Sequence, residues 1–261
     1  MKTSLLVSTY NWPEALELVF KSVENQTVKP DEFLIADDGS KLETKELIDS
    51  YIKKTTIPVV HVWHEDEGFR RSSILNKAIA KANGDYIIQT DGDCIMHKDF
   101  IKDHKANAIK NCYLYGSRVS ILESYLDTLF STKKMRFHFF SKGIKKRGRT
   151  LRIPFLAKLY RPKNTLSDKL RGCNLSFWKQ DFIAVNGYNE AMTGWGREDS
   201  ELIVRMLNKG IKGKRLKFGG IVYHIWHKTA SQHNFNKNDE IQKEAIEKKH
   251  TWCENGINQY L

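Results

Sequence analysis

The chain lacks a long apolar run, a closely spaced cysteine pair and a glycine-rich phosphate loop. No stretch approaches the roughly 18 apolar residues of a membrane span, and residues 1–8 are too short an apolar run for a signal peptide. The four cysteines show no C-x-x-C spacing, which argues against a zinc site or a disulfide framework. Neither G-x-G-x-x-G nor a Walker sequence is present, which argues against a dinucleotide oxidoreductase or an ATPase. We therefore expect a cytoplasmic protein.

The composition is that of a folded α/β protein with an excess of positive charge. Of 261 residues, 40% are hydrophobic and 28% charged, which is enough apolar material for one large domain. The net charge of +12 makes nucleic acid, an anionic membrane and phosphorylated ligands candidate partners. Much of the charge lies in residues 133–169, where lysines, arginines and aromatic residues accompany a single acid, Asp168. This segment suits attachment to anionic lipid, and equally a solvated insertion that binds substrate phosphates.

Residues 1–93 alternate between short apolar runs and amphipathic stretches. The apolar runs predict strands at 4–8, 33–36, 59–63 and 86–91, and Ser72–Asn83 has helical spacing. Asn11 and Ser40, each followed three residues later by a glutamate, are expected to cap the first two helices. Such alternation predicts parallel strands joined by right-handed crossovers in a doubly wound sheet.

Polar clusters follow each predicted strand. Because ligands bind at the carboxyl ends of the strands in such sheets, these clusters are expected to converge on one edge. They are Thr9-Tyr10-Asn11, Asp37-Asp38, Asp66-Glu67 and Asp91-Gly92-Asp93.

Asp91-Gly92-Asp93 is the strongest chemical signal of the four clusters. Two carboxylates at a strand end suit a hard divalent cation, which would stabilise charge on a departing diphosphate. Asp-Gly-Asp is also a common turn, but its place after the fourth strand of an alternating run favours the metal hypothesis. Asp38 could accept hydrogen bonds from a ribose or base, or serve only the turn. Tyr10 could stack on a base or belong to the core.

Two later motifs complete the candidate site. Trp195-Gly196 presents an indole face that suits a sugar ring, and Glu198 and Asp199 occupy the first turn of a helix. Adjacent helical positions point about 100° apart, so at most one acid is expected to act as a base. The helix dipole stabilises both carboxylates and counts against that role. His224 follows a late strand and could add a nitrogen ligand to the metal site, with His227 as the alternative.

Together these motifs resemble glycosyltransferase family 2, the inverting nucleotide-sugar transferases of the GT-A fold. The resemblance spans residues 4–227, and its last stretch is similar to the acceptor loop of the galactosyltransferase and chondroitin-polymerase branch. It implies an α/β fold with a Rossmann-like, mostly parallel central sheet and helices on both faces. The stretches that carry it are Val7–Asn11, Ile35–Ser40, Gly84–Asp93 and Gly194–Asp199.

The resemblance also implies a role for each site residue. Donor contacts are implied for Thr9, Tyr10, Asn11, Asp38, Arg70 and Asp91. The metal, Mn²⁺ with Mg²⁺ as the alternative, is implied to bind Asp93, His224 and Asp91. Asp199 is implied as the catalytic base, Glu198 as the residue that orients the acceptor, and Trp195 and Gly196 as further acceptor contacts. The basic segment 133–169 matches no family motif.

We therefore predict a metal-dependent hexosyltransferase that moves a sugar from a UDP-sugar to a saccharide or lipid-linked saccharide in cell-surface polysaccharide or lipopolysaccharide assembly. One domain is expected over 1–261, with a donor half (1–115), an acceptor half (116–235) and a helical tail (236–261). Peripheral contact with the inner face of the plasma membrane is also expected. A sugar nucleotidyltransferase is one alternative, although Ser8–Asn11 is not the basic, glycine-rich loop such enzymes need. A nucleic-acid-binding protein is the other, suggested by net charge alone.

Overall fold

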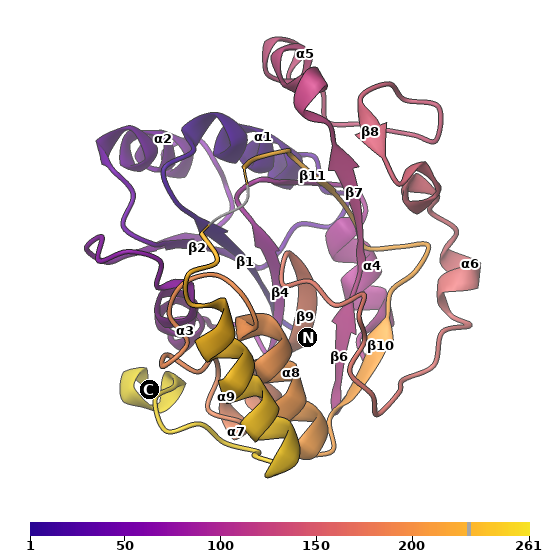
Figure 1. The fold of residues 1–261 in the computed structure, drawn as a ribbon. Helices are drawn as coiled ribbons and strands as arrows, with labels where there is room; N and C mark the ends of the chain where they lie inside the picture. The colour runs from indigo at the N-terminus through magenta and orange to yellow at the C-terminus, as the bar shows by residue number, and fades with distance from the viewer. Residues whose placement is uncertain (229–230) are drawn as a thin grey trace.

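A seven-stranded sheet with helices on both faces forms the body of the protein (Figure 1). The computed structural model describes residues 1–228 and 231–261. The strand order is β10-β6-β9-β4-β1-β2-β3. The four predicted strands form a parallel set: β1 (Thr3–Thr9), β2 (Glu32–Asp37), β3 (Val59–Trp63) and β4 (Tyr86–Asp91). The predicted α/β architecture is confirmed.

Alternating side chains of the central strands pack against two helical layers. In β1, Leu5 and Val7 join one buried cluster and Leu6 the other, as the period of two in a strand requires. Because both faces are covered, the side chains of β1 and β2 are almost all buried, with apolar residues in the middle of each strand. One layer contains α1 (Pro13–Glu24), α2 (Leu42–Ile52) and α4 (Phe100–Asn107). The other contains α3 (Arg71–Ala80), α7 (Lys179–Ala184) and α8 (Glu198–Asn208), and α9 (Phe235–Glu247) packs on α8.

A late strand lies in the middle of the large sheet. β9 (Asn174–Trp178) pairs antiparallel with β4 on one side and with β6 (Cys112–Tyr115) on the other. β10 (Lys212–Arg215) pairs with β6 at the edge. Since Thr90 is opposite Asn174, the start of β9 lies beside the end of β4. The residues just before β9 are therefore brought to the carboxyl edge of the parallel strands.

A smaller four-stranded sheet, in the order β5-β11-β7-β8, adjoins the same edge. Its strands are β5 (Cys94–Met96), β11 (Ile221–His224), β7 (Ser117–Ile121) and β8 (Ile144–Lys145). The sheet packs against α1 through a third apolar cluster. The pairing of β11 with β5 places His224 opposite Cys94, next to the end of the Asp91-Gly92-Asp93 motif.

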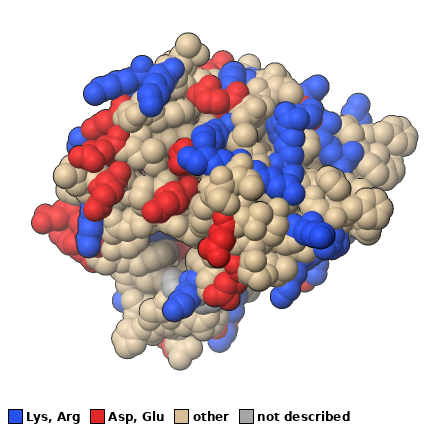
Figure 2. All heavy atoms as spheres, turned by 90° about the horizontal axis from the view of Figure 1, so that it is seen from above, with Lys and Arg blue, Asp and Glu red and all other residues tan. Residues whose placement is uncertain are grey.

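The basic segment has little regular structure. It follows the 3-10 helix η1 (Glu123–Tyr125) and α5 (Leu126–Thr132), and it contains β8, the 3-10 helix η2 (Arg147–Thr150) and α6 (Pro154–Ala157). Lysine and arginine side chains gather on the right-hand side of Figure 2, where β8 and α6 lie in Figure 1. Large apolar side chains are exposed here too, with Phe140 80% and Phe155 73% accessible. None of the described helices has the length and apolar character of a membrane span.

Two local predictions were wrong. Asn11 and Ser40 cap no helix, since α1 begins at Pro13 and α2 at Leu42 without side-chain caps. Instead, Asn11 accepts a hydrogen bond from the backbone of Lys41 (2.8 Å), and Ser40 accepts one from the backbone of Asn11 (2.9 Å). These bonds tie the loop after β1 to the loop after β2.

The C-terminal helical tail is shorter than predicted. The helix α9 ends at Glu247, and η3 (Ile257–Tyr260) is a separate 3-10 turn.

Candidate functional site

Asp93 lies between two histidines just beyond the end of β4. Its Oδ2 atom is 3.4 Å from His224 Nε2 and 3.2 Å from His227 Nε2, and the potential ligand atoms of all three residues lie within 4.8 Å of one another. The backbone N–H of Ile225 donates to the carbonyl of Asp93 (2.9 Å), which fixes the histidine loop against the Asp93 turn. One carboxylate and two imidazoles form a donor set that suits Mn²⁺ and other divalent transition metals. Three protein ligands leave further positions for oxygens of a diphosphate.

The pKa shifts of Asp93 and His224 favour metal binding, whereas that of His227 opposes it. Burial alone would raise the pKa of Asp93, but the two histidines outweigh burial and lower it. Burial lowers the pKa of His224, whereas the hydrogen bond with Asp93 raises that of His227. At neutral pH Asp93 is ionised and His224 neutral, which are the forms that bind a metal.

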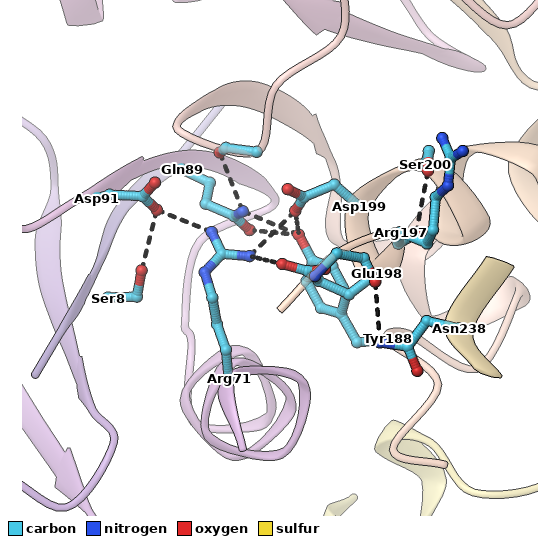
Figure 3. A network of polar contacts seen from close by, with 12 residues as sticks. Ser8, Arg71, Gln89, Asp91, Tyr188, Arg197, Glu198, Asp199, Ser200 and Asn238 are labelled. Carbon is cyan, nitrogen blue, oxygen red and sulfur yellow. Dashed lines mark hydrogen bonds and ion pairs between the residues drawn. The ribbon is translucent and has the colours of Figure 1, made fainter. Parts of the chain in front are cut away.

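Arg71 joins the end of β4 to the start of α8 (Figure 3). Its guanidinium donates to Asp91 Oδ1 (2.8 Å) and Asp199 Oδ1 (3.1 Å), and it lies 3.8 Å from Glu198 Oε1. Ser8 donates a further hydrogen bond to Asp91 (3.0 Å). The structure thus places the Asp91 carboxylate with Arg71, whereas the histidines surround Asp93. Asp91 as a metal ligand stays a prediction.

Asp199 occupies a tightly packed position at the start of α8. Tyr188 donates a hydrogen bond to its Oδ1 atom (3.1 Å), and Tyr188 is itself hydrogen-bonded to Gln89 (2.8 Å). The carboxylate packs directly on Gly172, where an added Cβ would lie 2.1 Å from its oxygens. The absence of a side chain at Gly172 leaves the space that Asp199 fills.

The loop before α8 presents its tryptophan to solvent. Gly196 (φ 111°) and Arg197 (φ 75°) are left-handed, a conformation that glycine adopts easily. Trp195 is 37% exposed and stacks on Phe235 of α9, with ring centroids 6.3 Å apart. The backbone N–H of Gly196 donates to Glu198 Oε2 (2.9 Å), so the loop and the first turn of α8 form one unit.

Glu198 is less exposed than Asp199, and its pKa is raised. Burial, followed by the charge of Asp199, raises the pKa of Glu198 to about 7, although Arg71 opposes the shift. The Glu198 side chain is 9% exposed and the Asp199 side chain 22%. Asp199 is therefore the more accessible acid, and Glu198 holds its proton more tightly than an ordinary glutamate does.

The raised pKa of Glu198 predicts a pH-dependent cost to stability. The folded state keeps the Glu198 proton up to about pH 7, whereas the unfolded chain releases it near the ordinary value of 4.5, so stability falls as pH rises through this range. Glu198→Gln removes this effect. Its free energy of unfolding, relative to the unmodified protein, should increase by up to about 3 kcal/mol between pH 4 and pH 8.

Urea unfolding at a series of pH values measures this difference. Glu43→Gln is the matched control, because Glu43 is an exposed glutamate in the first turn of α2. A Glu198→Gln difference that stays constant with pH would contradict the assignment.

The predicted nucleotide contacts lie on the loops after β1, β2 and β3. Asp38 is buried, with one oxygen 2.7 Å from His64 Nε2 and the other accepting from the backbone of Arg70 (3.0 Å). Thr9 is buried, and its carbonyl accepts from the backbone of Asp38 (3.0 Å). Tyr10 is 52% exposed and donates to Asp66 (2.8 Å). The exposed Tyr10 ring is not part of the core, which leaves its face open to a base.

Other predicted residues have structural contacts of their own. The Arg70 side chain pairs with Glu67 (2.6 Å) and bonds the carbonyl of Glu65 (2.7 Å). The Asn11 side chain accepts a hydrogen bond from the backbone of Lys41 and so joins the loops after β1 and β2. Both residues remain at the edge where the predicted contacts converge.

Sequence reasoning missed Arg71, Tyr188 and His64. One feature of the sequence could have indicated Arg71. It lies in the first turn of α3, where the helix dipole disfavours a cation, so a nearby acidic partner is expected. Its acidic partners lie 20 and 128 residues further along the chain, so no local pattern could reveal them. Tyr188 and His64 resemble ordinary buried residues in sequence and become visible only through Asp199 and Asp38.

Comparisons with known proteins identify the family of the chain. Residues 4–164 match the family described as Glycosyl transferase family 2, and residues 156–228 match the N-terminal domain of galactosyltransferase. The chain is 25% identical to a validoxylamine A glucosyltransferase of Streptomyces hygroscopicus subsp. limoneus, over 80% of this chain and 48% of that protein. It is 25% identical to a chondroitin synthase of Escherichia coli, over 85% of this chain and 34% of that protein.

A solved structure shows the same fold. The structure of GalNAc-T7 with UDP, GalNAc and Mn²⁺ superposes with a TM-score of 0.66 at 17% identity, covering 94% of this chain and 49% of that one. The chain thus spans half or less of the length of these proteins. It has the GT-A fold and belongs to glycosyl transferase family 2.

Proposed function

We propose that the protein is a metal-dependent, inverting transferase that moves a sugar from a UDP-sugar to a hydroxyl of a saccharide acceptor. One observation carries the proposal. The Asp93–His224–His227 cluster and the Glu198–Asp199 pair lie at the same end of β4, joined through Asp91 and Arg71. The likeness to a chondroitin synthase supports a role in cell-surface polysaccharide or lipopolysaccharide assembly.

The donor would occupy the edge formed by the loops after β1, β2 and β3. Tyr10 offers an exposed ring face to the base. Asp38 and the neighbouring Thr9 would hold uracil or ribose, with Arg70 as a further contact. Asn11 would keep the first two loops together through its bond to Lys41. Asp91 would face the ribose or the transferred sugar.

Asp93, His224 and His227 would hold the metal. Two imidazole nitrogens favour Mn²⁺ over Mg²⁺, which prefers oxygen ligands. A bound ion would supply positive charge to the leaving diphosphate. The protein contributes the geometry, since the Ile225–Asp93 backbone bond and the pairing of β11 with β5 hold the three side chains together before a ligand arrives.

Asp199 would act as the base. It takes the proton of the acceptor hydroxyl as that oxygen forms a bond to the anomeric carbon, and the electron pair of the breaking C–O bond leaves with UDP. Attack from the side opposite UDP inverts the configuration. Arg71 and Tyr188 would hold the Asp199 carboxylate in position through their hydrogen bonds. Trp195 and Gly196 would offer a face for the acceptor ring, and Glu198 would orient the acceptor.

The basic segment 133–169 would hold the protein against an anionic membrane. Phe139, Phe140, Phe155 and Leu159 are exposed among its lysines and arginines. Apolar side chains surrounded by cations are typical of peripheral attachment to anionic lipid. Acceptors that are lipid-linked would then be within reach.

A thermal-shift screen tests the donor. With Mn²⁺ present, UDP-sugars should raise the melting temperature by several degrees and GDP-sugars should not, because a ligand at about 100 times its Kd stabilises the folded state by about 2.7 kcal/mol. Release of UDP from UDP-sugars measures turnover in the same samples. Failure of every nucleotide sugar, combined with a gel shift on nucleic acid, would favour the alternative of a nucleic-acid-binding protein.

Gly172→Ala tests whether the exact position of Asp199 matters. The new methyl group would meet the Asp199 oxygens at 2.1 Å, so the carboxylate must move while the backbone need not. We expect kcat to fall about 100-fold, as for other misplacements of a reacting group by about 1 Å. UDP affinity should stay within about twofold. Gly148→Ala is the control, since nothing lies within 4 Å of a Cβ there; equal rates in both variants would contradict the prediction.

A further inference from the structure

A small hollow beside the site is lined almost entirely by cations. Its volume is about 50 Å³, which is room for several water molecules or one tetrahedral oxyanion. It contains no acidic side chain. The walls come from four separate parts of the chain: Gly116, Ser117 and Arg118; Lys146 and Arg149; Lys169 and Arg171; and Arg215.

Acidic side chains balance the cations of this hollow only in part: Asp93 lies near Arg118, and Asp168 lies near Lys169, Arg171 and Arg215. Of the six cations that line the hollow, only Lys169 forms an ion pair with a described residue, an exposed pair with Asp168 (2.6 Å). Partial burial, reinforced by the neighbouring arginines, lowers the pKa of both Lys146 and Arg149. Like charges held close together are unfavourable unless a ligand compensates them. An anion is the ligand that does so.

The guanidinium groups are held in place by contacts that leave their charge intact. Arg149 donates to the carbonyl of Arg118 (3.0 Å), and Arg171 donates to the carbonyl of Asp168 (2.9 Å). Bonds to neutral carbonyls orient an arginine without cancelling its charge. Cations that approach from several directions match an oxyanion with three or more oxygens, whereas a carboxylate is satisfied by one bidentate arginine.

The position of the hollow indicates the acceptor side of the site. Arg171 precedes Gly172, on which Asp199 packs. Burial opposes the charge of Arg118, but neighbouring groups, Asp93 among them, raise its pKa, so Arg118 lies near the metal cluster. The nucleotide loops after β1, β2 and β3 contribute no residue to the hollow. A ligand bound here would therefore lie near Asp199 and the metal cluster without contact with those three loops.

We propose that this hollow binds a phosphate group of the acceptor, a phosphomonoester or phosphodiester next to the hydroxyl that receives the sugar. The proposal rests on the proposed function and adds a substrate class to it: phosphate-bearing saccharide or polyol acceptors. The phosphate undergoes no chemistry. It anchors the acceptor while the neighbouring hydroxyl reaches Asp199.

The test removes two charges from the hollow and compares binding of three probes. The variant is Arg149→Gln with Arg171→Gln. The control is Lys142→Gln with Lys158→Gln, which removes the same charge from exposed positions of the basic segment outside the hollow. The probes are glycerol 3-phosphate, UDP with Mn²⁺, and vesicles containing phosphatidylglycerol, and calorimetry or co-sedimentation measures the affinity of the full chain for each.

We expect glycerol 3-phosphate to bind the unmodified and control proteins and to bind the Arg149/Arg171 variant at least tenfold more weakly. UDP affinity should stay within about twofold in all three. A parallel loss of UDP affinity would assign the hollow to the donor diphosphate and overturn the proposal. Loss of vesicle binding without any binding of glycerol 3-phosphate would assign it to lipid headgroups, with the same consequence. Release of UDP by the unmodified protein reports the proposed function independently of these outcomes.

Discussion

Asp199→Asn is expected to lower kcat for sugar transfer by about 10³-fold, within the range of 10²–10⁴ that a general base contributes. The amide has nearly the shape of the carboxylate and can still accept hydrogen bonds from Arg71 and Tyr188. It cannot accept a proton. Affinity for UDP with Mn²⁺ should therefore stay within about threefold, because Asp199 lies outside the metal cluster.

Steady-state transfer and calorimetric titration with UDP separate the two effects. Asp127→Asn is the matched control, an exposed aspartate in the first turn of α5, and both quantities should be unchanged in it. Equal losses of kcat and UDP affinity in Asp199→Asn would overturn the assignment of the base.

The pH profile distinguishes Asp199 from Glu198. If Glu198 were the base, the rate would rise through pH 7, where its carboxyl loses the proton. Glu198→Gln would then cost as much as Asp199→Asn. With Asp199 as the base, Glu198→Gln should lower kcat less than Asp199→Asn does. It should also remove any change of the rate with pH near pH 7, because the group that titrates there is gone.

Asp93→Ala is expected to abolish the dependence of UDP binding on metal. Removal of residues that only support metal ligands costs 10–100-fold in affinity, so loss of a direct ligand should cost about 100-fold or more. Asp93 is the one anion of the cluster, and the two imidazoles that remain carry no charge to balance a divalent cation. UDP affinity should fall to the value that the unmodified protein shows in EDTA.

Titration of UDP with and without Mn²⁺ measures this effect. His224→Gln and His227→Gln, tested in parallel, show which histidines bind the metal. His224 is 15% exposed and His227 42%, so His224 is the better held of the two. Undiminished Mn²⁺-dependent affinity in Asp93→Ala would show that Asp93 is no ligand.

Local sequence patterns predicted the parallel strands because each is a buried apolar run between helices of clear period. β9 could not be predicted in the same way, since its place between β4 and β6 is decided by pairing over about ninety residues. The smaller sheet was missed for the same reason. Its strands are short, and their hydrophobic pattern does not show which neighbours they join. The two predicted caps were wrong because the side chains of Asn11 and Ser40 form hydrogen bonds between the loops after β1 and β2 instead.

In the candidate site, too, local motifs could be predicted and long-range contacts could not. Asp93 and His224 were predicted from separate motifs, and the structure places them together with His227. Arg71 was missed because its role exists only when Asp91 and Asp199 face each other. Sequence motifs thus identified the acids, whereas the cation that holds two of them together depends on tertiary structure.

The central position of β9 also has a consequence for how the chain folds. The second edge of β4 stays unpaired until β9 has been synthesised, and β6 also pairs with β9. During synthesis, the parallel strands β1 to β4 therefore exist for several seconds as a sheet with an open edge, which is the kind of surface that aggregates. The pairing that closes this edge also fixes the position of Gly172, on which Asp199 packs, so the middle of the large sheet and the candidate site depend on the same strand.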